Sequence, residues 1–245
     1  MRKAIIILLV VLILLLNLPA IVLAAKQPNK PITPNELKNI TFIHYAKPDR
    51  PPGKPVPDDP LPPPEPINDY YKLLKLYLPD EVSYGINPAG APGSSFDIIA
   101  TSFETWDNVT DEPLFNDNPK LTSLFGLRYD EVNNISWAKI SGRRTIAVTS
   151  LWYIDDNNPE TFDAIIEFDM VFNSRLAWGI DSDTAYDVQN IATHEVGHVI
   201  GLADLYEDQY RELTMYGYGS IGETLKSTLE EGDRLGAQFI CASTP

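Results

Sequence analysis

Cysteine and histidine are both scarce in this sequence, which has one cysteine, Cys241, and three histidines, His44, His194 and His198, in 245 residues. A single cysteine excludes an intrachain disulfide and any metal site built from several cysteines. We therefore expect stability to come from packing and from bound metal, with Cys241 as a small buried apolar residue. A metal site in this chain must take its nitrogen ligands from the three histidines.

Positive charge is also in short supply. The chain has 19 lysines and arginines against 34 aspartates and glutamates, which gives a formal net charge of -15. Such a chain lacks the basic surface that neutralises phosphate groups, so we expect no nucleic-acid partner. Hydrophobic residues make up 44% of the chain and charged residues 22%. These average values exclude wholesale disorder and a polytopic membrane protein.

The longest hydrophobic run covers residues 4–25, directly after two basic residues, and it ends in small side chains. This order predicts a signal peptide over residues 1–25, cleaved after Ala24 or Ala25. The alternative is an uncleaved anchor, because a run of this length could cross a bilayer. Both interpretations imply export, either as a secreted extracellular protein or as one tethered to the cell surface, and only the second involves a membrane.

Proline is concentrated in residues 47–66, where it occupies half of the positions. Such a run favours the extended polyproline II conformation and acts as a semi-rigid spacer. We therefore expect residues 26–66 to be a propeptide or linker that folding does not require, although residues 40–45 form a short apolar patch. The folded domain is expected to span residues 67–245.

Hydrophobic periodicity within residues 67–245 predicts an α+β domain with a single sheet and about three helices. Strand-like segments are expected within residues 70–86, 135–140, 145–154 and 162–172. Helices are expected over residues 95–106, 187–200 and 225–241, and Ser94 or Ser95 can cap the first of them.

The segment HEVGHVIGLAD, from His194 to Asp204, carries the strongest chemical signal. Positions i and i+4 of a helix share one face, so His194 and His198 can offer two imidazole nitrogens to one zinc ion. Glu195 neighbours both histidines and can act on a water molecule without being a ligand. Gly201 lets the helix stop, after which Asp204 can supply a third ligand. Three protein ligands leave one position open, as in catalytic zinc sites.

This pattern, HExxHxxGxxD, resembles the signature of the metzincin zinc endopeptidases. Met215, in the sequence LTMYG, resembles the methionine of the Met-turn that follows the motif in that family. Residues 96–110, 165–173 and 229–241 resemble the first helix, the strand along the substrate cleft and the last helix of the matrixin branch. The resemblance implies that residues 67–245 form a zinc metalloprotease catalytic domain with a zincin-like fold, in which one twisted mixed sheet packs with an active-site helix followed by a Met-turn. It also implies one catalytic zinc ion and endopeptidase activity.

Matrixins usually carry a third histidine where this chain has Asp204, as the snapalysin-type metzincins do. The segment GLADLY, residues 201–206, extends the match to the GLxDxY of that group. This match implies that Tyr206 lies near the metal and assists by hydrogen bonding to the tetrahedral intermediate. The second, structural zinc site of matrixins and their cysteine switch have no counterpart in this sequence.

The expected reaction is hydrolysis of internal peptide bonds in protein or peptide substrates by a monomeric enzyme, with Glu195 as general base. Substrate is expected to lie extended along the strand near residues 165–172. Of the other oxygen and nitrogen donors, Glu207 and Asp208 lie beyond the turn, and His44 lies in a segment expected to be mobile.

Two further interpretations stay open. The chain could be a surface-anchored binding protein that keeps zinc as a structural element, but such a protein would not need Glu195 beside the metal. Acidic clusters at residues 155–158 and 181–183 could form calcium sites, although acids in loops are usually only solvated.

Overall fold

The computed structural model describes residues 36–48, 70–111, 113–142 and 144–244, all within one compact unit that covers Ile32–Pro245. The predicted signal peptide, residues 1–25, lies outside the described residues. Within the described ranges, none of the helices combines the length and the apolar character needed to span a bilayer.

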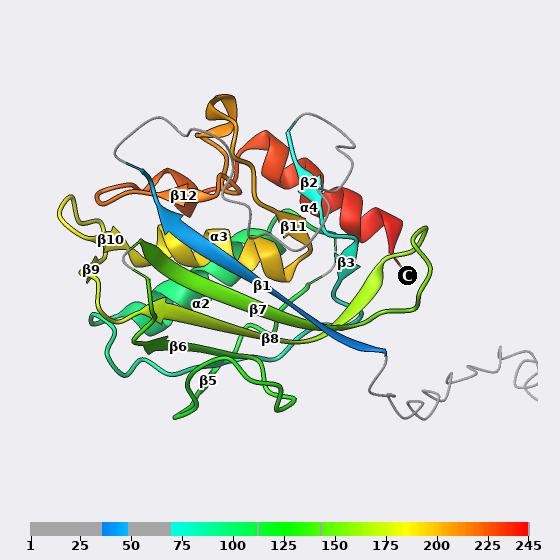
Figure 1. Ribbon diagram of the computed structural model, residues 1–245, viewed down its shortest axis with the longest axis horizontal. Coiled ribbons are helices and arrows are strands. Elements are labelled where there is room, and N and C mark those ends of the chain that lie inside the picture. Colours follow the sequence, from blue (N-terminus) through cyan, green and yellow to red (C-terminus); the bar gives the residue numbers. More distant parts are fainter. Residues whose placement is uncertain (1–35, 49–69, 112, 143, 245) are drawn as a thin grey trace, which may run out of the picture. The chain divides into compact units, whose positions relative to one another are not determined.

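The described residues form an α+β fold around a mixed sheet with the strand order β12-β1-β7-β8-β6-β4-β5, in which β3 also pairs with β8 (Figure 1). The bounds of these strands are β1 Leu37–Ala46, β3 Leu76–Tyr77, β4 Gly85–Ile86, β5 Lys120–Leu121, β6 Asn134–Ala138, β7 Thr145–Ile154, β8 Asp163–Asn173 and β12 Tyr218–Gly219. Two short pairs lie apart from this sheet: β2 Lys72–Leu73 with β11 Leu202–Ala203, and β9 Trp178–Gly179 with β10 Tyr186–Asp187.

Three α-helices belong to the described residues: α2 Ser95–Asp107, α3 Val188–Val199 and α4 Glu231–Ser243. Helix α2 buries Ile99, Phe103 and Trp106, whose spacing puts them on one helix face. The Trp106 ring also donates a hydrogen bond of 2.8 Å to the carbonyl oxygen of Thr193, so α2 is fastened to α3. Helix α3 packs in turn against β7 and β8, which places it under the centre of the sheet.

The predicted α+β class is confirmed, and so are the strands β6, β7 and β8 and the helices α2 and α3. The last helix begins later than predicted. Leu225–Ser227 forms a short 3-10 helix, and α4 starts at Glu231 because Glu230 and Asp233 cap each other's backbone in a capping box.

The prediction that the folded domain begins at residue 67 is wrong, because β1 is an inner strand of the sheet. It pairs with β7 along its length, from Leu37 opposite Ile154 to His44 opposite Ala147. Residues 40, 42 and 44 of β1 are buried, the period-two pattern of a strand with one face in the core. The proline-rich sequence that follows concealed this short strand, whereas the expectation that folding does not require residues 26–66 stays a prediction.

The expectation that substrate pairs with residues 165–172 is also wrong. These residues lie in β8, which is hydrogen-bonded to β7 on one side and to β6 on the other. The segment is therefore not the free sheet edge that this way of binding a peptide requires.

Strand β8 carries two buried carboxylates that hold one loop in place. Glu167 accepts a 3.0 Å hydrogen bond from the backbone N–H of Asp130, and Asp169 accepts one of 2.8 Å from that of Arg128. Burial raises the pKa of Asp169 to about 7, and the hydrogen bond from Arg128 only partly opposes this effect. The folded protein therefore holds a proton on Asp169 more tightly than the unfolded chain does.

The raised pKa predicts how the Asp169→Asn variant behaves. The ionised form of Asp169 is disfavoured in the folded state, so its unfavourable contribution appears as pH rises from about 4 to above 7. Asparagine keeps an oxygen for the Arg128 N–H and carries no charge. We expect Asp169→Asn to melt about 3 °C or more above the parent at pH 8 and within 1 °C of it at pH 4. Thermal unfolding followed by circular dichroism measures both values, and an equal difference at the two pH values would contradict the prediction.

Candidate metal centre

Side-chain and backbone interactions define both ends of helix α3, which carries the two histidines. The carboxylate of Asp187 caps its first turn by accepting a 2.8 Å hydrogen bond from the N–H of Asn190. At the other end Gly201 has φ of +104°, and a Cβ there would collide with the carbonyl oxygen of Leu76. Only glycine fits this position, so the helix stops and the chain turns back toward the histidines, as the motif predicted.

The turn brings Asp204 to His194 and His198. Asp204 Oδ1 lies 3.2 Å from His194 Nε2 and 3.6 Å from His198 Nε2. All three atoms are buried, and none of them has a hydrogen-bond partner of acceptable geometry in the described part of the chain. Leaving three buried polar atoms without partners is costly, and a cation held among them would satisfy all three. These residues therefore form a group that could hold a metal ion.

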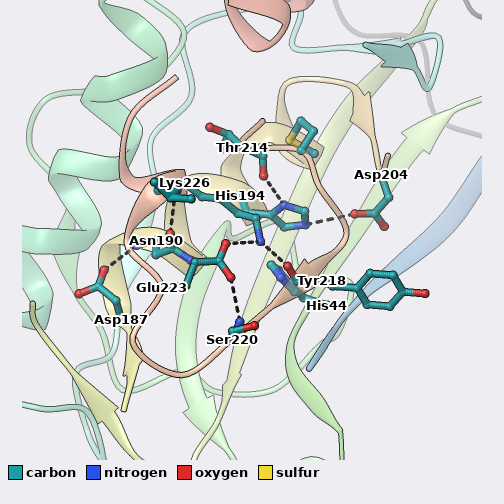
Figure 2. A network of polar contacts seen from close by, with 12 residues as sticks. His44, Asp187, Asn190, His194, Asp204, Thr214, Tyr218, Ser220, Glu223 and Lys226 are labelled. Atoms are coloured by element: carbon teal, nitrogen blue, oxygen red, sulfur yellow. Dashed lines mark hydrogen bonds and ion pairs between the residues drawn. The ribbon is translucent and has the colours of Figure 1, made fainter. Parts of the chain in front are cut away.

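The outer nitrogens of both imidazoles are held by backbone carbonyls. His194 Nδ1 donates to the carbonyl oxygen of Thr214 over 2.7 Å, as Figure 2 shows, and His198 Nδ1 donates to that of Leu202 over 2.8 Å. A carbonyl oxygen only accepts hydrogen bonds, so in each ring the proton is on Nδ1 and the lone pair is on Nε2. Backbone partners of this kind orient histidine ligands in metalloproteins.

Asp204 is oriented by Tyr206, whose hydroxyl donates a 2.9 Å hydrogen bond to Asp204 Oδ2. Burial by itself would raise the pKa of Asp204, but His198, His194 and the Tyr206 hydroxyl together outweigh it and lower that pKa. The carboxylate is therefore ionised at neutral pH, with Oδ1 free to bind a cation. Tyr206 holds the carboxylate in this structure, and its role in stabilising a tetrahedral intermediate stays a prediction.

Glu195 lies beside this group and does not belong to it. Its side chain is fully buried, with Oε2 accepting a hydrogen bond from the hydroxyl of Thr149 on β7. Burial raises the pKa of Glu195 to about 7, against the lowering effects of His194 and Thr149. A carboxylate with this pKa can take up and release a proton near neutral pH.

Met215 packs against the helix that carries the histidines. Its side chain is 1% exposed, and a Cβ at Gly197 would collide with its sulfur atom. The turn is fastened to the N-terminus of α4, because the carboxylate of Asp233 accepts hydrogen bonds from the backbone N–H groups of Thr214 (2.9 Å) and Met215 (3.2 Å). The Thr214 carbonyl oxygen that orients His194 therefore lies between two backbone N–H groups that Asp233 holds.

Two aromatic rings from β1 lie directly on the two histidines of this group. The ring of Phe42 stacks on that of His198 at 4.2 Å between centroids, and the ring of His44 lies 4.0 Å from that of His194. His44 Nδ1 is also 3.4 Å from Glu195 Oε1. The expectation that His44 lies in a mobile segment is therefore wrong, since it sits in β1 beside the group that Asp204 forms with His194 and His198. The alternating apolar pattern of residues 40–44 was the signal that could have found it.

The remaining predicted donors lie elsewhere. Glu207 pairs with Lys72 over 3.7 Å, and Asp208 begins a 3-10 helix, so neither joins the group around Asp204. Thr149 and Asp233 support the site but carried no signal in the sequence, because their partners come from distant elements.

The acidic loop at residues 155–158 brings Asp155 and Asp156 near Asp163. The carboxylates of Asp155 and Asp156 accept hydrogen bonds from their own loop, over 2.8 Å from the N–H of Asn157 and 2.7 Å from that of Asn158. Within the described residues no grouping suited to a metal includes residues 181–183. Calcium binding stays a prediction.

A buried lysine fixes β12 beside the site (Figure 2). Lys226 is fully buried, and its ammonium group donates to the carbonyl oxygen of Tyr218 over 2.5 Å and pairs with Glu223 over 3.0 Å. Its backbone N–H donates to Asn190 on α3 over 2.7 Å. This network ties β12 to the helix that carries His194.

Comparison with known proteins adds no family. No protein-family model and no curated protein matches this chain. The function must therefore be inferred from the chemistry of the residues at the site.

Proposed function

We propose that this chain is a zinc-dependent endopeptidase of the metzincin type. The observation that carries the proposal is the trio of buried, unpartnered atoms on His194, His198 and Asp204, with a proton-accepting carboxylate, Glu195, next to it and outside it. A protein that only stores a metal ion needs the trio, whereas a hydrolase needs the extra carboxylate as well.

Zinc is the metal that best suits this donor set. Two imidazole nitrogens and one carboxylate oxygen are ligands that zinc accepts, and three protein ligands leave a coordination position open. When bound, zinc supplies a Lewis acid that polarises the scissile carbonyl group and makes water easier to deprotonate.

The residues of the chain would perform the proton transfers. Glu195 would take a proton from the attacking water and deliver it to the nitrogen of the departing amine. The hydrogen bond from Thr149 orients the Glu195 carboxylate for both steps. Tyr206, Thr214 and Leu202 hold the three metal-binding side chains, so the site needs little rearrangement as the reaction proceeds.

One observation favours the second candidate, a binding protein that keeps a structural metal. The three metal-binding side chains are at most 8% exposed, as is usual for a metal that only stabilises a fold. The two functions differ in what Glu195 does, so a measurement of peptide hydrolysis separates them.

Metal removal tests the proposal. We expect the dialysed protein to retain about one zinc ion per chain, because the trio offers three ligands. A strong chelator should abolish hydrolysis of a mixed peptide pool, and added zinc should restore it. Elemental analysis gives the metal content and mass spectrometry gives the cleavage products. Hydrolysis that survives complete removal of the metal would contradict the proposal.

A further inference from the structure

The candidate site is closed, which is unexpected for an enzyme that acts on peptides. Glu195 and His194 are 0% exposed and His198 is 1% exposed. A peptide carbonyl group cannot reach Glu195 while these side chains are covered. Strand β1 contributes to this cover, because the rings of Phe42 and His44 lie against those of His198 and His194.

Strand β1 has the backbone pairing of a peptide that is bound by strand addition. It runs antiparallel to β7 along its length, and at its C-terminal end Tyr45 and Ala46 also pair in parallel with β12. Figure 1 shows it in blue between these two strands. Extended peptides are commonly recognised by this kind of strand addition, in which the backbone provides affinity and alternate side chains enter pockets. The alternate side chains of β1 that point inward include Phe42 and His44.

The register places the centre of β1 against the reacting groups. Phe42 is opposite Thr149, the residue that orients Glu195, and His44 is opposite Ala147. Both ring nitrogens of His44 are buried and have no hydrogen-bond partner in the described part of the chain. This arrangement is costly for a strand with only a structural role. The same cost is expected where a ring is held in place against the groups of an active site.

The chain connectivity allows β1 to leave. Strand β1 ends at Ala46 and the next strand, β2, begins at Lys72. A single cut in the sequence between them would separate β1 from the rest of the chain. The ladders from β7 through β8 to β6 and the packing of α2 on α3 do not involve β1.

We propose that β1 is an intramolecular inhibitor that fills the peptide-binding groove between β7 and β12, so that the site becomes accessible only when β1 departs. This inference rests on the proposed peptidase function. It also identifies the substrate geometry, an extended peptide that takes the place and direction of β1.

Cutting the folded chain tests the inference. A recognition sequence for a site-specific endopeptidase is inserted within residues 49–69, and the purified, zinc-loaded full chain is cut and diluted. We expect the N-terminal fragment to separate on size exclusion and hydrolysis of the peptide pool to rise at least tenfold. Transfer of zinc to a coloured chelator should accelerate by a similar factor, and a synthetic peptide of residues 36–47 should reverse both effects.

Substitution of the uncut chain provides a second test. Phe42→Asp puts a charge into the buried face of β1 and should loosen the strand, so that hydrolysis and zinc transfer both increase. Lys38→Asp places the same side chain on the exposed end of β1 and should leave both rates within twofold of the parent. If Phe42→Asp fails to fold, the cut chain decides alone.

The outcomes separate the two proposals. A fragment that stays bound after cutting and dilution, or one that leaves without changing hydrolysis and zinc transfer, would show that β1 is a permanent strand and would overturn the inference. Equal hydrolysis by the cut and uncut chains would overturn it as well, while supporting the peptidase function. Faster zinc transfer without hydrolysis in either form would support β1 as the cover of the site and overturn the peptidase function.

Discussion

Replacing Glu195 by glutamine is expected to lower peptide hydrolysis by about 10²- to 10⁴-fold, the usual contribution of a general base. Glutamine keeps the size of the side chain and can still bond to Thr149, but it cannot take a proton from water. Because Glu195 lies outside the group formed by His194, His198 and Asp204, the metal content should stay at the parent value. Hydrolysis by the cut chain and elemental analysis of the same sample measure the two quantities.

A matched control for Glu195→Gln is Glu207→Gln. Glu207 belongs to the same region of the chain but pairs with Lys72 at the surface, so its loss should change hydrolysis less than twofold. If Glu195→Gln hydrolyses peptides as fast as the parent, Glu195 is not the general base. The structural-metal alternative would gain support only if the parent also failed to hydrolyse peptides.

Replacing Asp204 by alanine is expected to remove most of the bound zinc and most of the activity. The substitution deletes one of three ligand atoms and leaves Tyr206 without the carboxylate that accepts its hydrogen bond. Loss of a partner that only orients a ligand already weakens metal binding by about 10- to 100-fold, so loss of a ligand should weaken it at least as much. Zinc content after dialysis against a weak chelator measures the effect.

Two further variants sharpen the Asp204 experiment. Asp204→His replaces the oxygen ligand by a nitrogen ligand and should retain zinc. Asp208→Ala removes a nearby carboxylate that the structure places outside the group, and it should bind zinc like the parent. A fully loaded Asp204→Ala protein would show that the third ligand lies elsewhere, and His44 would then be the first residue to test.

Much of the candidate site could be predicted because it is local in sequence. The spacing of His194 and His198 is set by one turn of a helix, and the stop at Gly201 is set by the backbone freedom of glycine. Asp204 follows within three residues of that stop, so the chain has few ways to place it. The strands β7 and β8 were predictable for a similar reason, since each is a long run of apolar and β-branched residues.

The contacts that support the candidate site, and those that control access to it, join distant parts of the chain. Thr149 reaches Glu195 only because β7 packs on α3, and Asp233 reaches the Met215 turn only because α4 begins there. Neither contact leaves a pattern in the sequence around the residue that makes it. The order of strands in the sheet also decides that β8 is an inner strand, which a reading of its apolar run could not show.

The sequence by itself determined the placement of His194, His198 and Glu195 and the helix that aligns them, because each depends on neighbours within a few residues. Only the tertiary structure decided that β1 belongs to the sheet and that Phe42 and His44 cover the site. Strand pairing joins residues about a hundred positions apart, such as Phe42 and Thr149, and its stability comes from a partner that the local sequence does not contain. A short strand before a proline-rich segment therefore looks like part of a linker until its partner is known.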